Sequence, residues 1–251
     1  MLINKLFLVF VMWVILCIPC NAENATELFS PEWIDLFQSD TAFPNISNDE
    51  YYVIDGVLFK ENILVAYPRN KSDKEYRVPD GTEIIGSCAF DGNQYLEKVF
   101  LPSSITCIGD GAFVGCTKLQ EINLPDRLLV IGSTAFAQCY SLKNIVLPSR
   151  LYVIGDQAFC DVPMLNGAFI VPSSVKYIGD ELLCNTNITI IIFNGCVHHL
   201  GHSLLGEPNP MIYYEIQVPD LSFSFAETLQ EEYADYDNVI VLETLSKHTH
   251  E

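Results

Sequence analysis

A short pattern, Ile-Gly-x-x-Ala-Phe, occurs four times in this chain at intervals of 23 residues. Its first residues are Ile85, Ile108, Ile131 and Ile154, and its last residues are Phe90, Phe113, Phe136 and Phe159. Self-similarity with a period of 20 to 50 residues is the sequence signature of stacked repeat architectures. The period therefore predicts a solenoid in which each copy forms one coil.

A second pattern, Leu-x-x-Ile/Val-x-Leu-Pro, alternates with the first, at 96–102, 119–125 and 142–148. Its last two apolar residues lie two positions apart, on one face of a short strand, and the proline ends that strand. We expect Ile-Gly to form a second strand and Ala-Phe a half-turn of helix, with the ring filling the coil. The predicted repeat core is Phe90, Phe113, Phe136, Phe159, Ile108, Ile131, Ile154, Leu119 and Leu142.

The repeat becomes irregular toward the C-terminus. Val171-Pro172 follows Leu147-Pro148 after 24 residues, which indicates one inserted residue near Gly167. Ile178-Gly179 keeps the phase, and 197–205 copies 175–183 at a spacing of 22. Six coils therefore carry the Ile-Gly motif or its remnant, and a β-rich solenoid is the predicted fold class.

Two glycine-rich segments imitate catalytic loops. In "CIGDGAFVGC" the second glycine, Gly111, could suggest a phosphate-binding loop, but Cys88, Thr134 and Gln157 replace it in the other copies. The segment 201–206 resembles a nucleophile elbow around Ser203, although that motif requires a small residue where Leu205 stands. We predict no catalytic residue and no cofactor, and treat a secreted hydrolase as the weakest alternative function.

Together, Ile-Gly-x-x-Ala-Phe-x-x-Cys and Leu-x-x-Ile-x-Leu-Pro at this period resemble the BspA-type leucine-rich repeats, over about residues 51–242. The resemblance implies a right-handed coil of short strands and short helical turns. It also implies a strand-rich N-terminal cap at 51–77, repeats at 78–206 and an α/β C-terminal cap at 207–243. Proteins of this family are mostly secreted or surface molecules, and several are adhesins.

The N-terminus has the features of a secretory signal peptide. Lys5 precedes an apolar run from Leu6 to Pro19, and a small residue, Ala22, suits cleavage. The run is short for a membrane span, although a retained anchor is an open alternative. We expect residues 1–22 to be removed, 23–50 to be a partly ordered linker, 244–251 to be a disordered tail and the product to be extracellular, without membrane insertion.

Charge restricts the partners. The chain has 13 basic and 32 acidic residues, a formal net charge of −19, and loss of Lys5 makes it −20. Such a field repels nucleic acids and anionic membranes. In a eukaryotic secretory pathway, four sequons offer candidate glycosylation sites at Asn24, Asn45, Asn70 and Asn187.

Cysteine and histidine are the residue types that could form cross-links or bind a metal ion. Cys116 and Cys139 share a repeat phase, as do Cys160 and Cys184, so each pair is a candidate disulfide. We favour buried free thiols, because side chains on a parallel ladder lie somewhat far apart for bridging. The histidines at 198, 199 and 202 lie on an extended segment and turn, and we predict no metal site.

One row of residues should face solvent along the Leu-x-x-Ile-x-Leu strands. It contains Phe100, Asn123, Val146, Ile170 and Ile192, with neighbours two residues earlier at Lys98, Glu121, Asn144 and Ala168. Four of the first five are apolar, which is unusual for a solvated face. We predict that this sheet face binds an extracellular protein or glycan, with Phe100 and Val146 as anchors. Ordinary strand propensity, cover by a cap or a partner coil, and self-association into a structural homo-oligomer are the alternatives.

Overall fold

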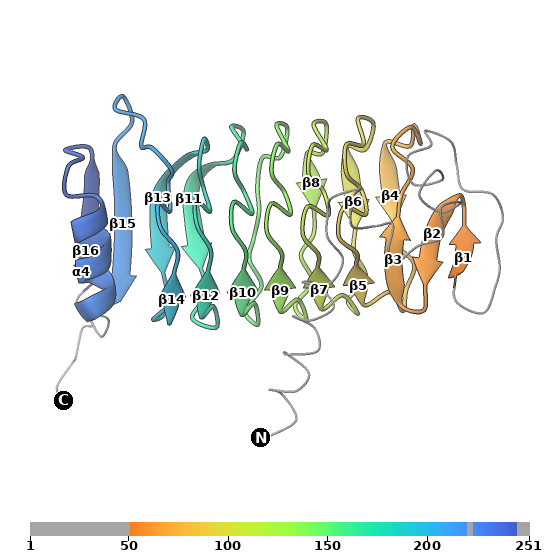
Figure 1. The fold of residues 1–251 in the computed structure, drawn as a ribbon, viewed down its shortest axis with the longest axis horizontal. Helices are drawn as coiled ribbons and strands as arrows, with labels where there is room; N and C mark the ends of the chain where they lie inside the picture. Colours follow the sequence, from red (N-terminus) through yellow and green to blue (C-terminus); the bar gives the residue numbers. More distant parts are fainter. Residues whose placement is uncertain (1–50, 220–222, 245–251) are drawn as a thin grey trace, which may run out of the picture.

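The computed structural model describes residues 51–219 and 223–244, which form a row of stacked coils (Figure 1). The expected signal peptide, the 23–50 linker, Asn24, Asn45 and the tail from residue 245 lie outside the described residues. Within the described ranges no helix has the length and apolar character to cross a bilayer.

One long sheet runs the length of the array and contains the Ile-Gly strands. Its order is β1 (Tyr51–Ile54), β2 (Val57–Lys60), β3 (Ile63–Ala66), β5 (Ile84–Ile85), β7 (Cys107–Ile108), β9 (Val130–Ile131), β10 (Val153–Ile154), β12 (Tyr177–Ile178) and β14 (His199–Leu200). From β3 onward every pair is parallel. Ile85 is paired with Ile108, and the ladder continues through Ile131, Ile154, Ile178 and Leu200. The spacings read from the sequence are therefore the pairing register of the sheet.

The N-terminal end of this sheet is antiparallel. β1 pairs with β2, and β2 pairs with β3. Asp55 and Gly56 form the first turn with φ values of 50° and 76°. Two consecutive positive φ angles are characteristic of the tight hairpin turn that an Asp-Gly pair favours.

The second side of the coils has two shorter sheets. β4 (Glu75–Arg77), β6 (Lys98–Phe100) and β8 (Glu121–Ile122) form one, and β11 (Asn166–Val171), β13 (Asn187–Phe193), β15 (Tyr214–Pro219) and β16 (Val239–Thr244) form the other. The helix α4 (Phe223–Glu232) lies beside β16 at the C-terminal end (Figure 1). The register of β11 with β13 shifts between Gly167 and Ala168, so that the pairing skips Thr189 of β13.

The copy at 142–148 differs from expectation, because it has no assigned strand. Its main chain still approaches the preceding coil, but the hydrogen bond from Lys143 N to Gln120 O is long at 3.4 Å. β8 itself ends at Ile122 because Asn123 pairs with the previous coil through its side chain instead of its backbone. The break therefore separates the two shorter sheets.

The core is a column of aromatic rings along the axis of the stack. Phe90, Phe113, Phe136 and Phe159 are fully buried, and successive ring centroids lie 4.7, 5.3 and 5.3 Å apart with nearly parallel planes. The predicted core residues Ile108, Ile131, Ile154, Leu119 and Leu142 are buried around them. Each coil thus covers the apolar edge of its neighbour.

The glycine of each Ile-Gly pair allows the coils to approach each other. A Cβ added to Gly109 would lie 2.7 Å from the backbone nitrogen of Ser87 and 2.9 Å from the carbonyl carbon of Gly86. Real Cβ atoms do not approach backbone so closely, and neither backbone can yield without breaking the sheet. This glycine is required for stacking.

The second glycine of the segment 107–116 has a different explanation. Gly111 has φ +59°, and the same position is left-handed in every other coil, at Cys88, Thr134, Gln157, Glu181 and Ser203. The corner of the coil needs this conformation, which glycine adopts without strain. Gly111 is a turn residue and has no role that requires phosphate.

Phe136→Ala should destabilise the protein by about 3–5 kcal/mol, because it opens a cavity in the centre of the ring column. Thermal unfolding followed by circular dichroism measures the effect. Tyr140→Ala, which removes an aromatic ring that is 46% exposed, is the matched control and should change the Tm little. Equal losses in the two variants would contradict the ring column as the source of stability.

Gly109→Ala should destabilise by about 1–3 kcal/mol or more, because the added methyl group collides with the backbone of the preceding coil. Denaturant titration checks this value. Ser87→Ala, at the opposite side of the same contact, adds no atom and should be close to wild type. An unchanged midpoint for Gly109→Ala would show that the coils can separate without cost.

Candidate binding surface

The predicted row of outward residues runs along the side of the coils that carries the two shorter sheets, with Asn123, Asn144 and Val146 in the break between them. We call it the outer stripe: Phe100, Asn123, Val146, Ile170 and Ile192, with Lys98, Glu121, Asn144 and Ala168 beside them. Lys98 is paired with Glu121, and Ile170 is paired with Ile192. This pairing sets the register of Ile192.

The N-terminal half of the stripe is occupied by contacts within the chain. The guanidinium of Arg77 lies 3.9 Å from the centre of the Phe100 ring. Lys98 Nζ and Glu121 Oε2 are 3.0 Å apart, and this hydrogen bond raises the pKa of Lys98. Phe100 is consequently half-buried, with the Arg77 guanidinium against its ring.

Asn123 has a structural role in the same region. Its Oδ1 accepts a hydrogen bond from Leu101 N, and its Nδ2 donates to Leu101 O, both at 2.8 Å. The amide therefore replaces a backbone pair of the parallel sheet. Both the oxygen and the nitrogen of the Asn123 side chain are therefore hydrogen-bonded within the chain.

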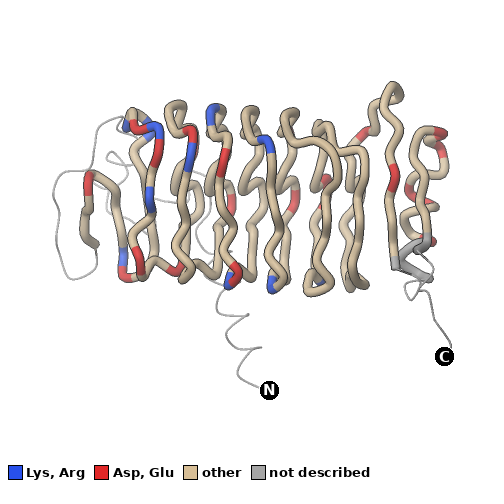
Figure 2. Tube along the Cα trace, turned by 180° about the vertical axis from the view of Figure 1, so that it is seen from behind, with Lys and Arg blue, Asp and Glu red and all other residues tan. Residues whose placement is uncertain are grey.

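The C-terminal half of the stripe is apolar and open to solvent. Val146 is 80% exposed and Ile170 is 50% exposed, while Ile192 is half-buried. Seen from behind, charged residues are frequent along the coils of β4, β6 and β8 and sparse along those of β11 and β13 (Figure 2). The exposed apolar part of the outer stripe therefore begins at Val146.

The structure extends this surface to residues that the sequence analysis did not assign. Ile192 is paired with Gln217 and Gln217 with Leu242, while Ile190 continues through Glu215 to Ile240. Ile240 and Leu242 are exposed on the last strand, β16. Their alternation with Val239 and Val241 was the available signal, but the sequence does not state which strand β16 joins.

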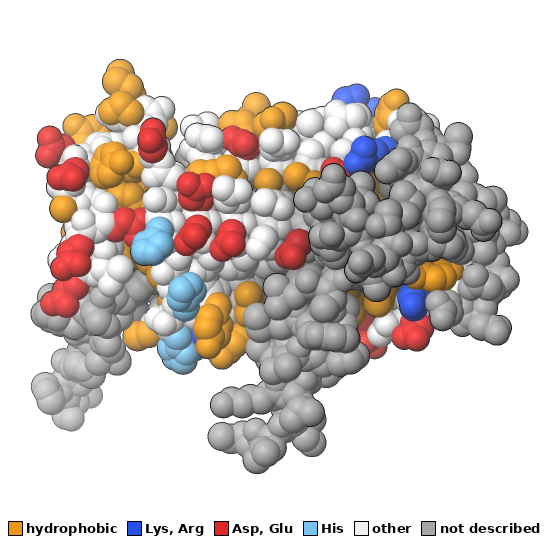
Figure 3. Space-filling model, viewed as in Figure 1, with side chains coloured by type: hydrophobic (Ala, Val, Ile, Leu, Met, Phe, Trp, Pro, Cys, Tyr) orange, Lys and Arg blue, Asp and Glu red, His pale blue; other side chains and the backbone are white. Residues whose placement is uncertain are grey.

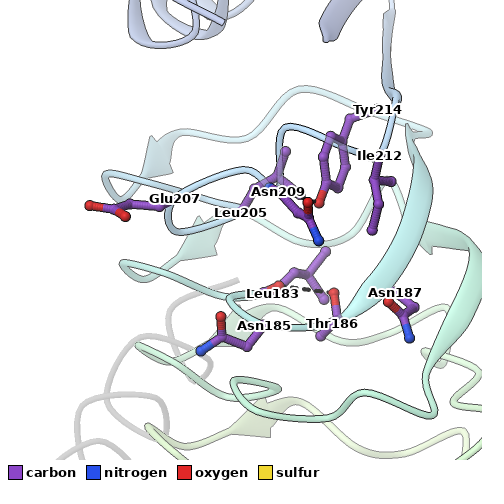
Figure 4. A pocket seen from close by; sticks show the side chains of 9 residues that line it. All are labelled: Leu183, Asn185, Thr186, Asn187, Leu205, Glu207, Asn209, Ile212 and Tyr214. Atoms are coloured by element: carbon purple, nitrogen blue, oxygen red, sulfur yellow. Dashed lines mark hydrogen bonds between the residues drawn. The ribbon is translucent and has the colours of Figure 1, made fainter.

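A shallow pocket of about 200 Å³ lies near the C-terminal end, between the coil at 183–187 and the loop at 205–214 (Figure 4). Two of its polar side chains are engaged in hydrogen bonds within the chain. Thr186 Oγ1 donates to Leu183 O at 2.9 Å, and Asn185 Nδ2 donates to Asp161 Oδ1 at 2.8 Å. The first bond lies within one coil and the second joins neighbouring coils, so the pocket follows from the packing of the last coils.

The two described sequons differ in their surroundings. Asn70 lies in an exposed turn after β3. Asn187 is exposed at the start of β13, but its Nδ2 donates to Pro163 O at 2.6 Å. Of the two, Asn70 has the less constrained amide.

Of the two candidate cysteine pairs, one forms a disulfide and the other does not. Cys160 and Cys184 form a disulfide with Cα atoms 4.6 Å apart, so the expectation of free thiols is wrong for this pair. Cys116 and Cys139 are free and buried, and their thiols donate to Phe90 O and Phe113 O. Those sulfurs point along the core, toward carbonyls of the neighbouring coil, and burial raises the pKa of both thiols.

Three aspartates that follow Ile-Gly pairs cap the next coil. Oδ1 of Asp110 accepts from Ser133 N at 2.7 Å, Asp156 from Asp180 N at 2.9 Å and Asp180 from His202 N at 2.7 Å. Figure 3 shows acidic side chains in a row across the coils, with histidines at its C-terminal end. Among the described residues, no group of three or more His, Cys, Asp or Glu side chains could hold a metal ion.

The resemblance of 201–206 to a nucleophile elbow also has a structural cause. Ser203 has φ +54°, the conformation that the same corner takes in every earlier coil. His202 is held by its backbone bond to Asp180. The strained serine is thus a consequence of the repeat.

Family comparison agrees with this architecture. A model described as BspA type Leucine rich repeat region matches residues 69–189 in six copies. The fold and the repeats together define a leucine-rich-repeat solenoid. Residues 69–189 are a leucine-rich repeat region of the BspA type.

Solved structures are similar to the chain over the repeats. A leucine rich cell surface protein from Faecalibacterium prausnitzii is 33% identical with a TM-score of 0.54, over 59% of this chain and 40% of that one. The pneumococcal vaccine antigen PcpA shares the fold at 24% identity and a TM-score of 0.53, over 78% of this chain and 49% of that one. The chain thus spans less than half the length of either. No protein of curated function matches the sequence.

Asp110→Asn should raise the Tm at pH 7 and have less effect as the pH falls toward 4. Burial raises the pKa of Asp110, and the Asp156 carboxylate adds to this, while the Ser133 N–H opposes it. The folded protein then holds the proton more tightly than the unfolded chain, so this group destabilises the fold above its ordinary pKa. The asparagine carbonyl can still accept from Ser133.

The measurement is Tm between pH 3.5 and 8 for Asp110→Asn and for Asp126→Asn, an exposed carboxylate that serves as the control. If Asp110→Asn raises the Tm by the same amount at every pH, ionisation of the Asp110 carboxyl is not the cause of the effect.

Proposed function

We propose that this chain is a secreted or cell-surface binding protein that holds an extracellular protein or glycan on the C-terminal half of its outer stripe. The observation that carries the proposal is the exposure of Val146 and Ile170 on a rigid parallel scaffold. Solenoids present such extended surfaces for binding, and contiguous exposed apolar area is typical of interaction sites. Likeness to a protein named as a cell surface protein supports the location.

The chemistry of the surface limits the partner. Apolar side chains at Val146, Ile170 and Ile192 are flanked by neutral Asn144 and Ala168, without a cluster of basic residues. With a net charge of −19, the chain repels nucleic acid and anionic lipid. A protein face or the apolar face of a sugar ring fits this composition. Glycosylation at Asn70 is compatible, because Asn70 lies outside the stripe.

Replacing Val146 and Ile170 together with Ser should weaken binding at least tenfold, about 1.4 kcal/mol, because both anchors lose their apolar contact. Partners are first captured from extracellular matrix and cell-surface extracts with the secreted protein. Affinity for a captured and purified partner is then measured for each variant.

The control is Met164→Ser with Tyr140→Ser, which removes two exposed apolar side chains outside the stripe. Both double variants should keep nearly the wild-type Tm, since surface substitutions seldom change stability by more than about 0.5 kcal/mol. If the Val146 and Ile170 variant binds as tightly as wild type, the interface lies elsewhere.

One observation favours self-association as a second candidate function. β16 is the last strand of its sheet, with Ile240 and Leu242 exposed, and an edge strand can pair with another chain. Light scattering with and without reductant distinguishes an edge-paired oligomer from one linked by disulfides. Ile240→Lys should return an edge-paired oligomer to monomer.

A further inference from the structure

A group of aromatic rings lies on the outward side of the long sheet, over its last coils. Tyr177 and His199 are paired with each other, one position before the inward residues of β12 and β14, so both point away from the core. Tyr177 is 43% exposed, and its ring centre lies 5.7 Å from that of Tyr152 and 6.5 Å from that of His199. We call these three residues the aromatic face.

Two exposed aspartates border the aromatic face. Asp156 follows β10 by two residues, and Asp180 follows β12 by two residues. Asp180 N donates to Oδ1 of Asp156, and His202 N donates to Oδ1 of Asp180, so the next coil holds each carboxylate in place. In the described part of the chain, Oδ2 of neither aspartate accepts a hydrogen bond or forms an ion pair. Figure 3 shows acidic, histidine and apolar side chains adjoining one another over these coils.

Charge is distributed unevenly along the chain. Residues 51–150 contain 11 acidic and 10 basic residues, whereas residues 151–244 contain 13 acidic residues and one basic residue, Lys176. Nζ of Lys176 donates to the carbonyl oxygens of Ser173 and Cys196 at 2.8 and 2.9 Å. The coils that carry the aromatic face therefore have a large excess of negative charge, and their basic side chain is held by backbone carbonyls.

The N-terminal coils pair their aromatic rings with cations of the same chain. Four rings there have an ammonium or guanidinium group over them: Lys60 over Tyr51, Lys71 over Tyr67, Arg77 over Phe100 and Lys118 over Tyr95. Ion pairs between described residues also extend no further than Glu121. From residue 122 to 244, the described part of the chain has neither kind of pair. Its rings and carboxylates are thus open to a cation from another molecule.

We propose that the aromatic face is a docking site for an arginine-rich segment of a basic partner protein. A guanidinium can lie on the Tyr177 ring and donate to a neighbouring carboxylate at the same time, because it is planar and has donors along its edges. The Arg77 guanidinium makes the same kind of ring contact within this chain, 3.9 Å from the centre of Phe100. The negative charge of the C-terminal coils attracts such a segment over a longer range.

This docking site is separate from the outer stripe, which lies on the other side of the coils. The proposal therefore does not depend on the proposed function of the stripe. It assigns the two sides different partners, since the stripe offers apolar side chains and the aromatic face offers rings beside carboxylates.

Binding of a fluorescein-labelled octa-arginine peptide, followed by fluorescence anisotropy at about 50 mM NaCl, tests the proposal. Asp156→Asn with Asp180→Asn should weaken binding at least tenfold, because each asparagine oxygen keeps the backbone hydrogen bond but the charge is lost. The matched control is Glu231→Gln with Asp235→Asn, which removes two charges from exposed positions on and after α4. It should change the affinity by less than about twofold.

The contribution of the ring is tested separately. Tyr177→Ser should weaken octa-arginine binding at least threefold, whereas Tyr213→Ser, which removes a ring that is 76% exposed elsewhere, should have no effect. Val146→Ser with Ile170→Ser should also leave this binding unchanged, which separates it from any partner of the outer stripe. Equal weakening by the two charge variants would show general attraction to an acidic protein and would overturn the proposal. Unchanged affinity in the Asp156 and Asp180 variant, or in Tyr177→Ser, overturns it as well.

Discussion

The close approach of backbone to backbone at the Ile-Gly corner is the constraint on which the rest of the molecule depends. Gly109 has no space for even one methyl group against the preceding coil. That contact sets the rise of the stack, and the rise brings the phenylalanine rings to stacking distance, 4.7–5.3 Å between centroids. Replacement of this glycine would therefore disturb the sheet and the ring column together.

Because the inward positions are fixed by stacking, variation between copies is confined to corners and outward positions. The left-handed corner accepts Gly111, Thr134 or Gln157, since the rest of the coil holds its conformation in place. The outward position of the shorter sheets accepts Asn123 as a substitute for backbone pairing and Val146 as an exposed apolar residue. A scaffold of this kind can change its surface without changing its core, which suits a binding protein.

The molecule has two outward faces of different character. The outer stripe is charged and internally paired at its N-terminal end, through Lys98 and Glu121, and apolar toward Ile170 and Leu242. The outward residues of the long sheet have the reverse arrangement, with buried Cys107 and Val130 first and exposed Tyr177 and His199 later. Uncovered apolar surface thus collects toward the C-terminal coils, where the repeat pattern has also weakened.

The sequence by itself determined the coil. Short-range patterns that occur in several copies indicate the 23-residue period and the later spacings of 24 and 22. The same patterns predict the burial of Phe113 and Phe136. Tertiary structure decided what depends on two coils at once. Four features require the relative placement of neighbouring turns. They are the disulfide between Cys160 and Cys184, the loss of a strand at 142–148, the Arg77 guanidinium over Phe100 and the pairing of Leu242 with Gln217. A repeat pattern specifies what one coil contains, but side-chain direction and register between coils are set by packing, which no single copy encodes.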